Sequence, residues 1–265
     1  MNKINRIGAI AVLASVSVLA NADLVSLTDG SAVVNIDTNN TAGLIRDYRI
    51  DGVDNLFAGE LYWRIGGGTA VGITNTLAAN TTVNQVSASQ VQITYTQTDF
   101  TMRVIYTLLG GAAQGNLAEQ VMVTNTSGQA LDFRLWQYTD FDLAGGTNTV
   151  TRTGNASMQQ TSAAYLMDTT SSSVAQFSQL GEFPTVRTQI TTADADLLVA
   201  AGNGIGESFV GDSTYAFEYV RQIGVGEAVL FGSNRHLAAV PEPGTMLALA
   251  AGASLIAARR RRKKA

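Results

Sequence analysis

The middle of this chain alternates apolar and polar residues over short stretches that glycine-containing turns separate. In residues 100–108, positions 100, 102, 104, 106 and 108 are all apolar. They would share one face of a β-strand, because successive side chains in a strand point to opposite faces. Comparable runs occur at 31–36, 43–50, 60–65, 91–96, 117–124, 131–138, 215–223 and 228–232. The pattern predicts an all-β fold, a single antiparallel β-sandwich domain over residues 23–239.

One stretch of this middle region departs from the strand pattern. Residues 156–174 are rich in Ser, Thr and Ala and show no apolar alternation. We therefore expect a long loop or a weakly ordered insertion there. No internal repeat of fixed period is present, and Pro184 is the only proline between the two ends, so no linker divides the region.

Charge is distributed unevenly along the chain. The net charge is -4, yet eight of the 17 basic residues lie within the first ten and last ten positions. Residues 23–239 keep nine arginines against 20 of the 21 acids, a net charge of -11. Such a surface repels phosphates, which argues against a nucleic-acid partner. Cysteine is absent, which excludes a thiol nucleophile, disulfides and a thioether-linked lipid.

The N-terminus has the three parts of a secretory signal peptide. Lys3 and Arg6 precede an apolar stretch at 7–19, and Ala20-Asn21-Ala22 forms a small-x-small cleavage site. We expect the Sec translocon to export the chain and signal peptidase to remove residues 1–22. The mature protein would then begin at Asp23.

The C-terminus combines an extended motif, an apolar stretch and a basic block. Two prolines in Val240-Pro241-Glu242-Pro243 disfavour a helix or a ladder strand. As a helix, the apolar residues 245–258 would be roughly 21 Å long, whereas the hydrocarbon core of a bilayer is about 30 Å thick. This short transmembrane helix would therefore anchor the protein in the membrane only transiently. The positive-inside rule keeps the basic block cytoplasmic and places the domain outside. That block is Arg259, Arg260, Arg261, Arg262, Lys263 and Lys264.

These C-terminal features resemble the PEP-CTERM sorting tail of Gram-negative bacteria in residue type, order and position. The resemblance implies recognition of residues 240–265 by an exosortase, cleavage near the motif, and release or attachment at the cell surface. It also implies an association with exopolysaccharide and biofilm formation. We expect the mature form to lack residues 259–265. The alternative is an ordinary tail anchor that carries a chance Pro-Glu-Pro.

The domain offers few residues for catalysis, and we predict no catalytic, cofactor-binding or metal-binding residue. His236 is the only histidine, so multi-histidine metal sites are excluded and we expect this side chain to be solvated. A Ser-His-Asp site would need a nucleophile elbow that the sequence lacks. The glycines at 66–68 and 202–206 lack the Lys-Ser/Thr of a phosphate-binding loop and are predicted to be turns.

Three aspartate pairs are the strongest candidates for a site. They are Asp140/Asp142, Asp194/Asp196 and Asp51/Asp54. Such pairs are most often solvated or cap turns, but their oxygens also suit calcium, or the two acids of a glycosidase. Because a complete calcium-loop pattern is absent, we expect no cofactor, and calcium binding is the alternative.

Aromatic residues offer a second candidate surface. Trp136 and Tyr138 would share a strand face while Tyr62 and Trp63 would not, and we expect these rings to be core residues rather than a sugar-stacking shelf. Residues 116–146 also resemble the paired strands of galactose mutarotase-like β-sandwiches. That resemblance implies the sandwich but no mutarotase activity, because Gln137, Tyr138 and Asp140 stand where those enzymes use histidines.

Three functions fit these observations. The first is a non-enzymatic surface or matrix protein delivered by the sorting tail. The second is a carbohydrate-binding module for exopolysaccharide, and the third is a carbohydrate-active enzyme with two acids facing one cleft. The acidic β-domain and the lack of a catalytic motif favour the first.

Overall fold

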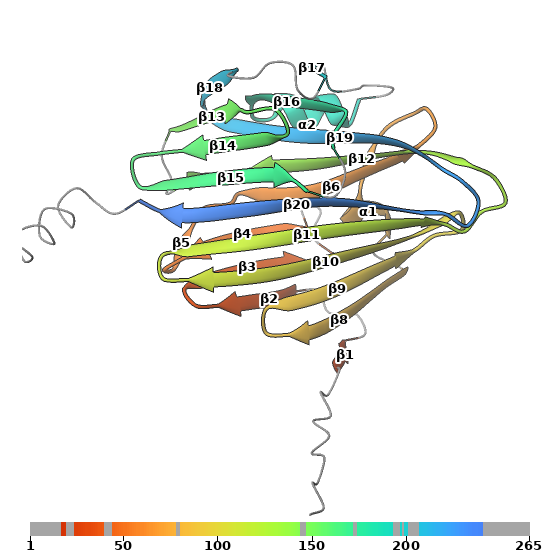
Figure 1. The fold of residues 1–265 in the computed structure, drawn as a ribbon, viewed down its shortest axis with the longest axis horizontal. Coiled ribbons are helices and arrows are strands. Elements are labelled where there is room, and N and C mark those ends of the chain that lie inside the picture. The colour runs from red at the N-terminus through yellow and green to blue at the C-terminus, as the bar shows by residue number, and fades with distance from the viewer. Residues whose placement is uncertain are drawn as a thin grey trace, which may run out of the picture.

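The fold is a two-layer antiparallel β-sandwich (Figure 1), as the sequence predicts. The computed structural model describes residues 17–19, 24–39, 44–77, 80–143, 147–171, 174–192, 197, 199–200 and 207–240. Sheet A contains, in spatial order, β1 (Ser17–Leu19), β8 (Thr81–Ser87), β9 (Gln90–Thr96), β10 (Phe100–Gly111), β11 (Gln114–Asn125), β20 (Ala228–Ala239), β15 (Ala164–Thr170), β14 (Ala156–Gln160), β13 (Asn148–Arg152) and β18 (Ser208–Gly211).

Sheet B forms the second layer and carries both short helices of the described residues. Its order is β17 (Val199–Ala200), β16 (Phe177–Glu182), β19 (Ser213–Ile223), β12 (Leu131–Asp140), β6 (Ala58–Ile65), β4 (Ile45–Ile50), β3 (Ala32–Asp37) and β2 (Leu24–Asp29). Strand β5 (Val53–Asp54) pairs with β4, and β7 (Val71–Gly72) pairs with β6. The helices are α1 (Ile73–Leu77) and α2 (Thr185–Ile190).

The main hydrophobic core lies between the inner faces of the two sheets. Residues 100, 102, 104, 106 and 108 of β10 are all buried there, which confirms the face predicted from their alternation. From sheet B, Leu135 of β12 and Phe217 of β19 enter the same core. Burial of these apolar side chains from both layers is the main source of stability in a sandwich of this kind.

The prediction of a loop at 156–174 is wrong, because this segment contains strands β14 and β15, which lie inside sheet A between β13 and β20. Its inward positions include Ser157, Gln159 and Asp168, all buried. Two of these polar groups are hydrogen-bonded inside the sandwich: Gln159 donates to the carbonyl oxygen of Phe141, and Asp168 accepts from Arg235. Strand geometry is therefore present without the apolar alternation that would have revealed it.

The two ends of the chain are described only in part. Within the predicted signal peptide, Ser17–Leu19 forms β1, which pairs with β8 at the edge of sheet A. If signal peptidase removes residues 1–22, we expect β8 to become that edge in the mature protein. Among the described residues, no helix has the length and apolar character needed to cross a membrane. The predicted transmembrane helix at 245–258 lies outside the described residues.

Candidate functional site

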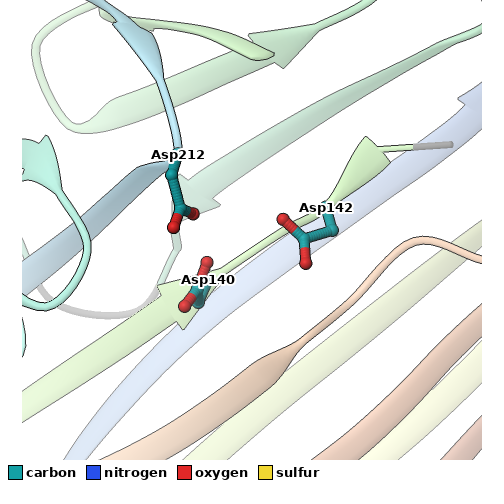
Figure 2. A group of neighbouring side chains, drawn as sticks. All are labelled: Asp140, Asp142 and Asp212. Carbon is teal, nitrogen blue, oxygen red and sulfur yellow. The ribbon is translucent and has the colours of Figure 1, made fainter. Parts of the chain in front are cut away.

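Three aspartates from two distant segments meet at one end of sheet B (Figure 2). Asp140 ends β12, Asp142 follows two residues later, and Asp212 joins β18 to β19. Strands β12 and β19 are antiparallel neighbours with Asp140 opposite Thr214, so the start of β19 lies beside the end of β12. One carboxylate oxygen from each aspartate lies within 4.8 Å of the others.

The three carboxylates differ in their surroundings. Asp140 is 1% exposed, whereas Asp142 and Asp212 are exposed. The hydroxyl of Tyr138 donates to Oδ2 of Asp140 at 3.3 Å, but Oδ1 has no hydrogen-bond partner among the described residues. Burial raises the pKa of Asp140 to about 7, and the charges of Asp142 and Asp212 raise it as well. Such a group can hold a proton near neutral pH or share a cation with its neighbours.

The sequence identified two members of this cluster and missed the third. The Asp140/Asp142 pair is brought together as its spacing suggested, but Asp212 enters only through the pairing of β12 with β19. No spacing rule connects residues so far apart. The pair Asp51/Asp54 lies at the β4–β5 turn, where Oδ1 of Asp54 accepts from the backbone N–H of Leu56. Asp194 and Asp196 lie outside the described residues.

The outer face of sheet B carries a buried aromatic layer. Trp136, Tyr138 and Tyr62 form a second hydrophobic cluster there, while Trp63 faces the main core. Val186 and Ile190 of α2 belong to the same cluster. The guanidinium of Arg64 lies 5.3 Å from the centre of the Trp136 ring. Trp136 is 0% exposed, so the prediction of core aromatics is confirmed for this ring.

Glu60 is buried on the same outer face, next to this aromatic layer. Its Oε2 accepts a hydrogen bond from the hydroxyl of Thr74 at 3.0 Å, and its Oε1 accepts one from the N–H of Leu61 at 3.1 Å. Burial raises the pKa of Glu60 to about 8, although these donors and the charge of Arg187 act in the opposite direction. At neutral pH the side chain is therefore mainly protonated.

A buried ion cluster lies between the sheets and was not anticipated. Arg235 of β20 donates from Nε to Asp168 of β15 at 3.2 Å and from Nη1 to Glu119 of β11 at 3.4 Å. The hydroxyl of Tyr215 also donates to Asp168, at 3.0 Å. Burial alone would lower the pKa of Arg235, but the two carboxylates raise it above its ordinary value. The guanidinium therefore stays charged and neutralises its acidic partners.

The remaining predicted features of the domain are the single histidine and the glycine-rich turns. His236 is half-buried on β20, with its ring centre 5.6 Å from that of Tyr165, rather than fully solvated. The glycines at 66–68 form bends after β6, as predicted, and 202–206 lie outside the described residues.

Of the predicted sorting and cleavage residues, the structure describes only Val240. Val240 is the last described residue, and its N–H donates to the carbonyl oxygen of Ala163 at 2.7 Å. The motif therefore begins where the ladder of β20 ends. Three groups of predicted residues lie outside the described part of the chain: the rest of the motif, Pro241, Glu242 and Pro243; the cleavage residues Ala20, Ala22 and Asp23; and the basic block 259–264.

A comparison with known families finds one match, the PEP-CTERM protein-sorting motif, at residues 239–263. This motif marks an exported protein with a membrane-anchored sorting signal that an exosortase recognises. Among curated proteins, none matches the sequence.

Solved structures show a similar fold at low sequence identity. A proposed aldose 1-epimerase of Escherichia coli K12 is 9% identical, with a TM-score of 0.57 over 82% of this chain and 99% of its own. A galactose mutarotase-related enzyme of Lactobacillus acidophilus is 10% identical, with a TM-score of 0.53 over 82% and 97%. A bacterial glucoamylase in complex with acarbose is 9% identical, with a TM-score of 0.54 over 94% of this chain but 37% of its own. The described domain thus has the two-sheet fold of galactose mutarotase-like proteins, and the chain ends in a PEP-CTERM sorting motif.

Proposed function

We propose that this protein is a non-enzymatic component of the cell surface or extracellular matrix that an exosortase processes and that accompanies exopolysaccharide in a biofilm. The match to the PEP-CTERM motif supports this route. Processing near the motif would remove the basic block and leave a domain with a net charge of -11. Such a charge keeps a protein soluble outside the cell and lets it interact with cations in a matrix.

The observation that carries the proposal is the position of the motif relative to the fold. Val240 makes the last described backbone hydrogen bond, and only residues 241–244 separate it from the apolar stretch. Four extended residues span at most about 14 Å. Before cleavage, the end of the sandwich where β20 terminates would therefore lie close to the membrane surface. An enzyme at that surface would find the motif within reach.

The test is to locate the protein and determine its C-terminus in cells with and without their exosortase. We expect the wild-type protein outside the cell, with mass spectrometry showing that residues 259–265 are absent. Glu242→Ala should retain the full tail in the membrane fraction. Ser254→Ala, within the apolar stretch but outside the motif, is the matched control and should be processed normally. Residues 259–265 on the extracellular form would contradict the proposal.

Carbohydrate binding is a second candidate, supported by the similarity of the fold to a proposed aldose 1-epimerase and to a glucoamylase in complex with acarbose. The aromatic rings of Tyr62, Trp136 and Tyr138 cluster with residues of α2. Because the rings are buried, a polysaccharide could reach them only if α2 moved. The chain has two tryptophans on opposite faces of sheet B, which provides a matched pair of variants. In pull-down with exopolysaccharide, Trp136→Phe should lose retention while Trp63→Phe keeps it. Equal retention by both variants would reject this candidate.

A further inference from the structure

We propose that Asp140, Asp142 and Asp212 form a calcium-binding site at the end of sheet B. The inference does not depend on the sorting route, because it concerns the folded domain alone. It rests on the geometry of the three carboxylates, on the unpaired buried oxygen of Asp140 and on the absence of a nearby basic partner.

The geometry of the three carboxylates fits a shared cation. Calcium binds oxygen ligands at about 2.3–2.6 Å, so two oxygens on one ion lie at most about 5 Å apart. One oxygen from each of the three aspartates already lies within 4.8 Å of the others. No large rearrangement of the strands is therefore needed to bring all three onto one ion.

The second observation is the buried carboxylate itself. Asp140 is 1% exposed and its Oδ1 has no hydrogen-bond partner among the described residues. Figure 2 shows its carboxylate directed toward the space that Asp142 and Asp212 border. A buried acceptor without a partner is costly to maintain. A cation in that space would satisfy this oxygen and offset the repulsion between the three carboxylates.

The described part of the chain supplies no basic side chain for this role. None lies within ion-pair distance of the three aspartates. The charge of Arg187 acts to lower the pKa of Asp140, and the Nε of Arg187 donates to the hydroxyl of Tyr62 at 2.8 Å. A cation from solution could therefore supply the positive charge that balances the cluster.

The ligand chemistry favours calcium over other cations. All candidate ligands are carboxylate oxygens, which hard cations prefer, and no histidine or cysteine lies in the cluster. Magnesium demands near-ideal octahedral geometry and loses its water reluctantly. Two of the three aspartates are exposed, so water can complete the larger and more irregular shell of calcium. Sites of this kind in extracellular modules have dissociation constants of about 0.1–1 mM.

The experiment is calcium titration of the purified full-length protein after removal of metal with EDTA. Calorimetry should show one site with a dissociation constant of about 0.1–1 mM. The melting temperature should rise by about 3–6 °C in 10 mM CaCl2. Magnesium chloride at the same concentration should give less than half of this rise.

Single substitutions assign the site. Asp212→Asn and Asp142→Asn change exposed side chains outside the strands and should weaken calcium binding at least tenfold without unfolding the protein. Asp132→Asn is the matched control, because Asp132 is an exposed aspartate on β12 at the other end of the strand. Three results would each overturn the proposal: no calcium heat and no melting shift, wild-type affinity in Asp212→Asn, or an equal effect of magnesium.

Discussion

Buried acidic side chains lie in two regions of this domain, between the sheets and on the outer face of sheet B, and they differ in whether a basic side chain meets them. On the outer face, Glu218 pairs with Arg134 at 3.1 Å. Between the sheets, Glu119 and Asp168 lie against the guanidinium of Arg235. On the outer face of sheet B, Glu60 and Asp140 are equally buried, yet no basic side chain of the described residues lies within ion-pair distance of either. Burial raises the pKa of Asp168, Asp140 and Glu60, and the adjacent charge and hydrogen bond of Arg235 oppose this effect at Asp168.

The comparison shows that burial alone does not decide what a carboxyl group does here. A charged carboxylate is stable inside the sandwich only because a charged donor from a neighbouring strand meets it. On the outer face, Glu218 also meets a guanidinium, that of Arg134 at 3.1 Å, whereas the contacts described above for Glu60 and Asp140 are hydrogen bonds from neutral donors. Glu60 and Asp140 can therefore take up a proton or, at the rim, a cation from solution. Paired charges are thus part of the folded structure, whereas these two outer acids can respond to the medium.

The largest effect should follow from removing the internal cation. Arg235→Met would leave Glu119 and Asp168 buried without a counter-charge, which typically costs about 3–5 kcal/mol of folding free energy. Thermal or urea unfolding should show a melting temperature lower by about 10 °C. Arg103→Met is the control, because Arg103 is half-buried on β10 and points away from the main core. A similar loss in both variants would remove the distinction between the two regions.

The pH dependence of stability tests whether Glu60, a buried acid on the outer face, is protonated in the folded protein. The pKa is about 8 in the folded protein, against an ordinary value of 4.5, so the folded state binds more protons between these values. Stability should therefore fall as pH rises from about 4.5 to about 8. At pH 9, Glu60→Gln should be more stable than wild type by on the order of a few kcal/mol, with little difference near pH 5.

The control for this prediction is Glu182→Gln, which changes an exposed glutamate at the end of β16. Its stability should follow the wild-type pH dependence throughout, measured by urea unfolding at a series of pH values. If Glu60→Gln shows the same dependence of unfolding free energy on pH as the wild-type protein, Glu60 is already ionised in the folded protein.

The same comparison explains which parts of the fold could be predicted from sequence. Strand β10 was predicted because its inward positions are apolar. Strands β14 and β15 were missed because their inward positions include Gln159 and Asp168, whose partners come from other strands. The ion cluster was missed for the same reason: charged residues in separate strands look like surface residues until the register aligns them. Asp212 of the outer cluster likewise depended on the pairing of β12 with β19.

Arg152 provides an intermediate case between the two regions. It is 1% exposed, and its Nη2 lies 3.0 Å from Oε2 of Glu207, which is 45% exposed. Burial lowers the pKa of Arg152, and Glu207 opposes this effect. Glu207→Gln would leave a buried cation with a weaker partner, so we expect a loss of about 1–2 kcal/mol in urea unfolding. A loss as large as that of Arg235→Met would mean that partial exposure of one partner makes no difference.

The smallest effect should come from an ion pair that water already screens. Arg46 lies 3.6 Å from Asp37, with 55% of the arginine side chain exposed. Arg46→Gln should cost about 0–1 kcal/mol in low salt, and less in 0.5 M NaCl, because exposed charges are hydrated before they pair. Arg235→Met should keep its full cost at both salt concentrations, since solution ions do not reach the interior. If added salt reduced the Arg235 effect as strongly as the Arg46 effect, the inner cluster would be open to solvent, and the contrast between the sandwich interior and its outer face would fail.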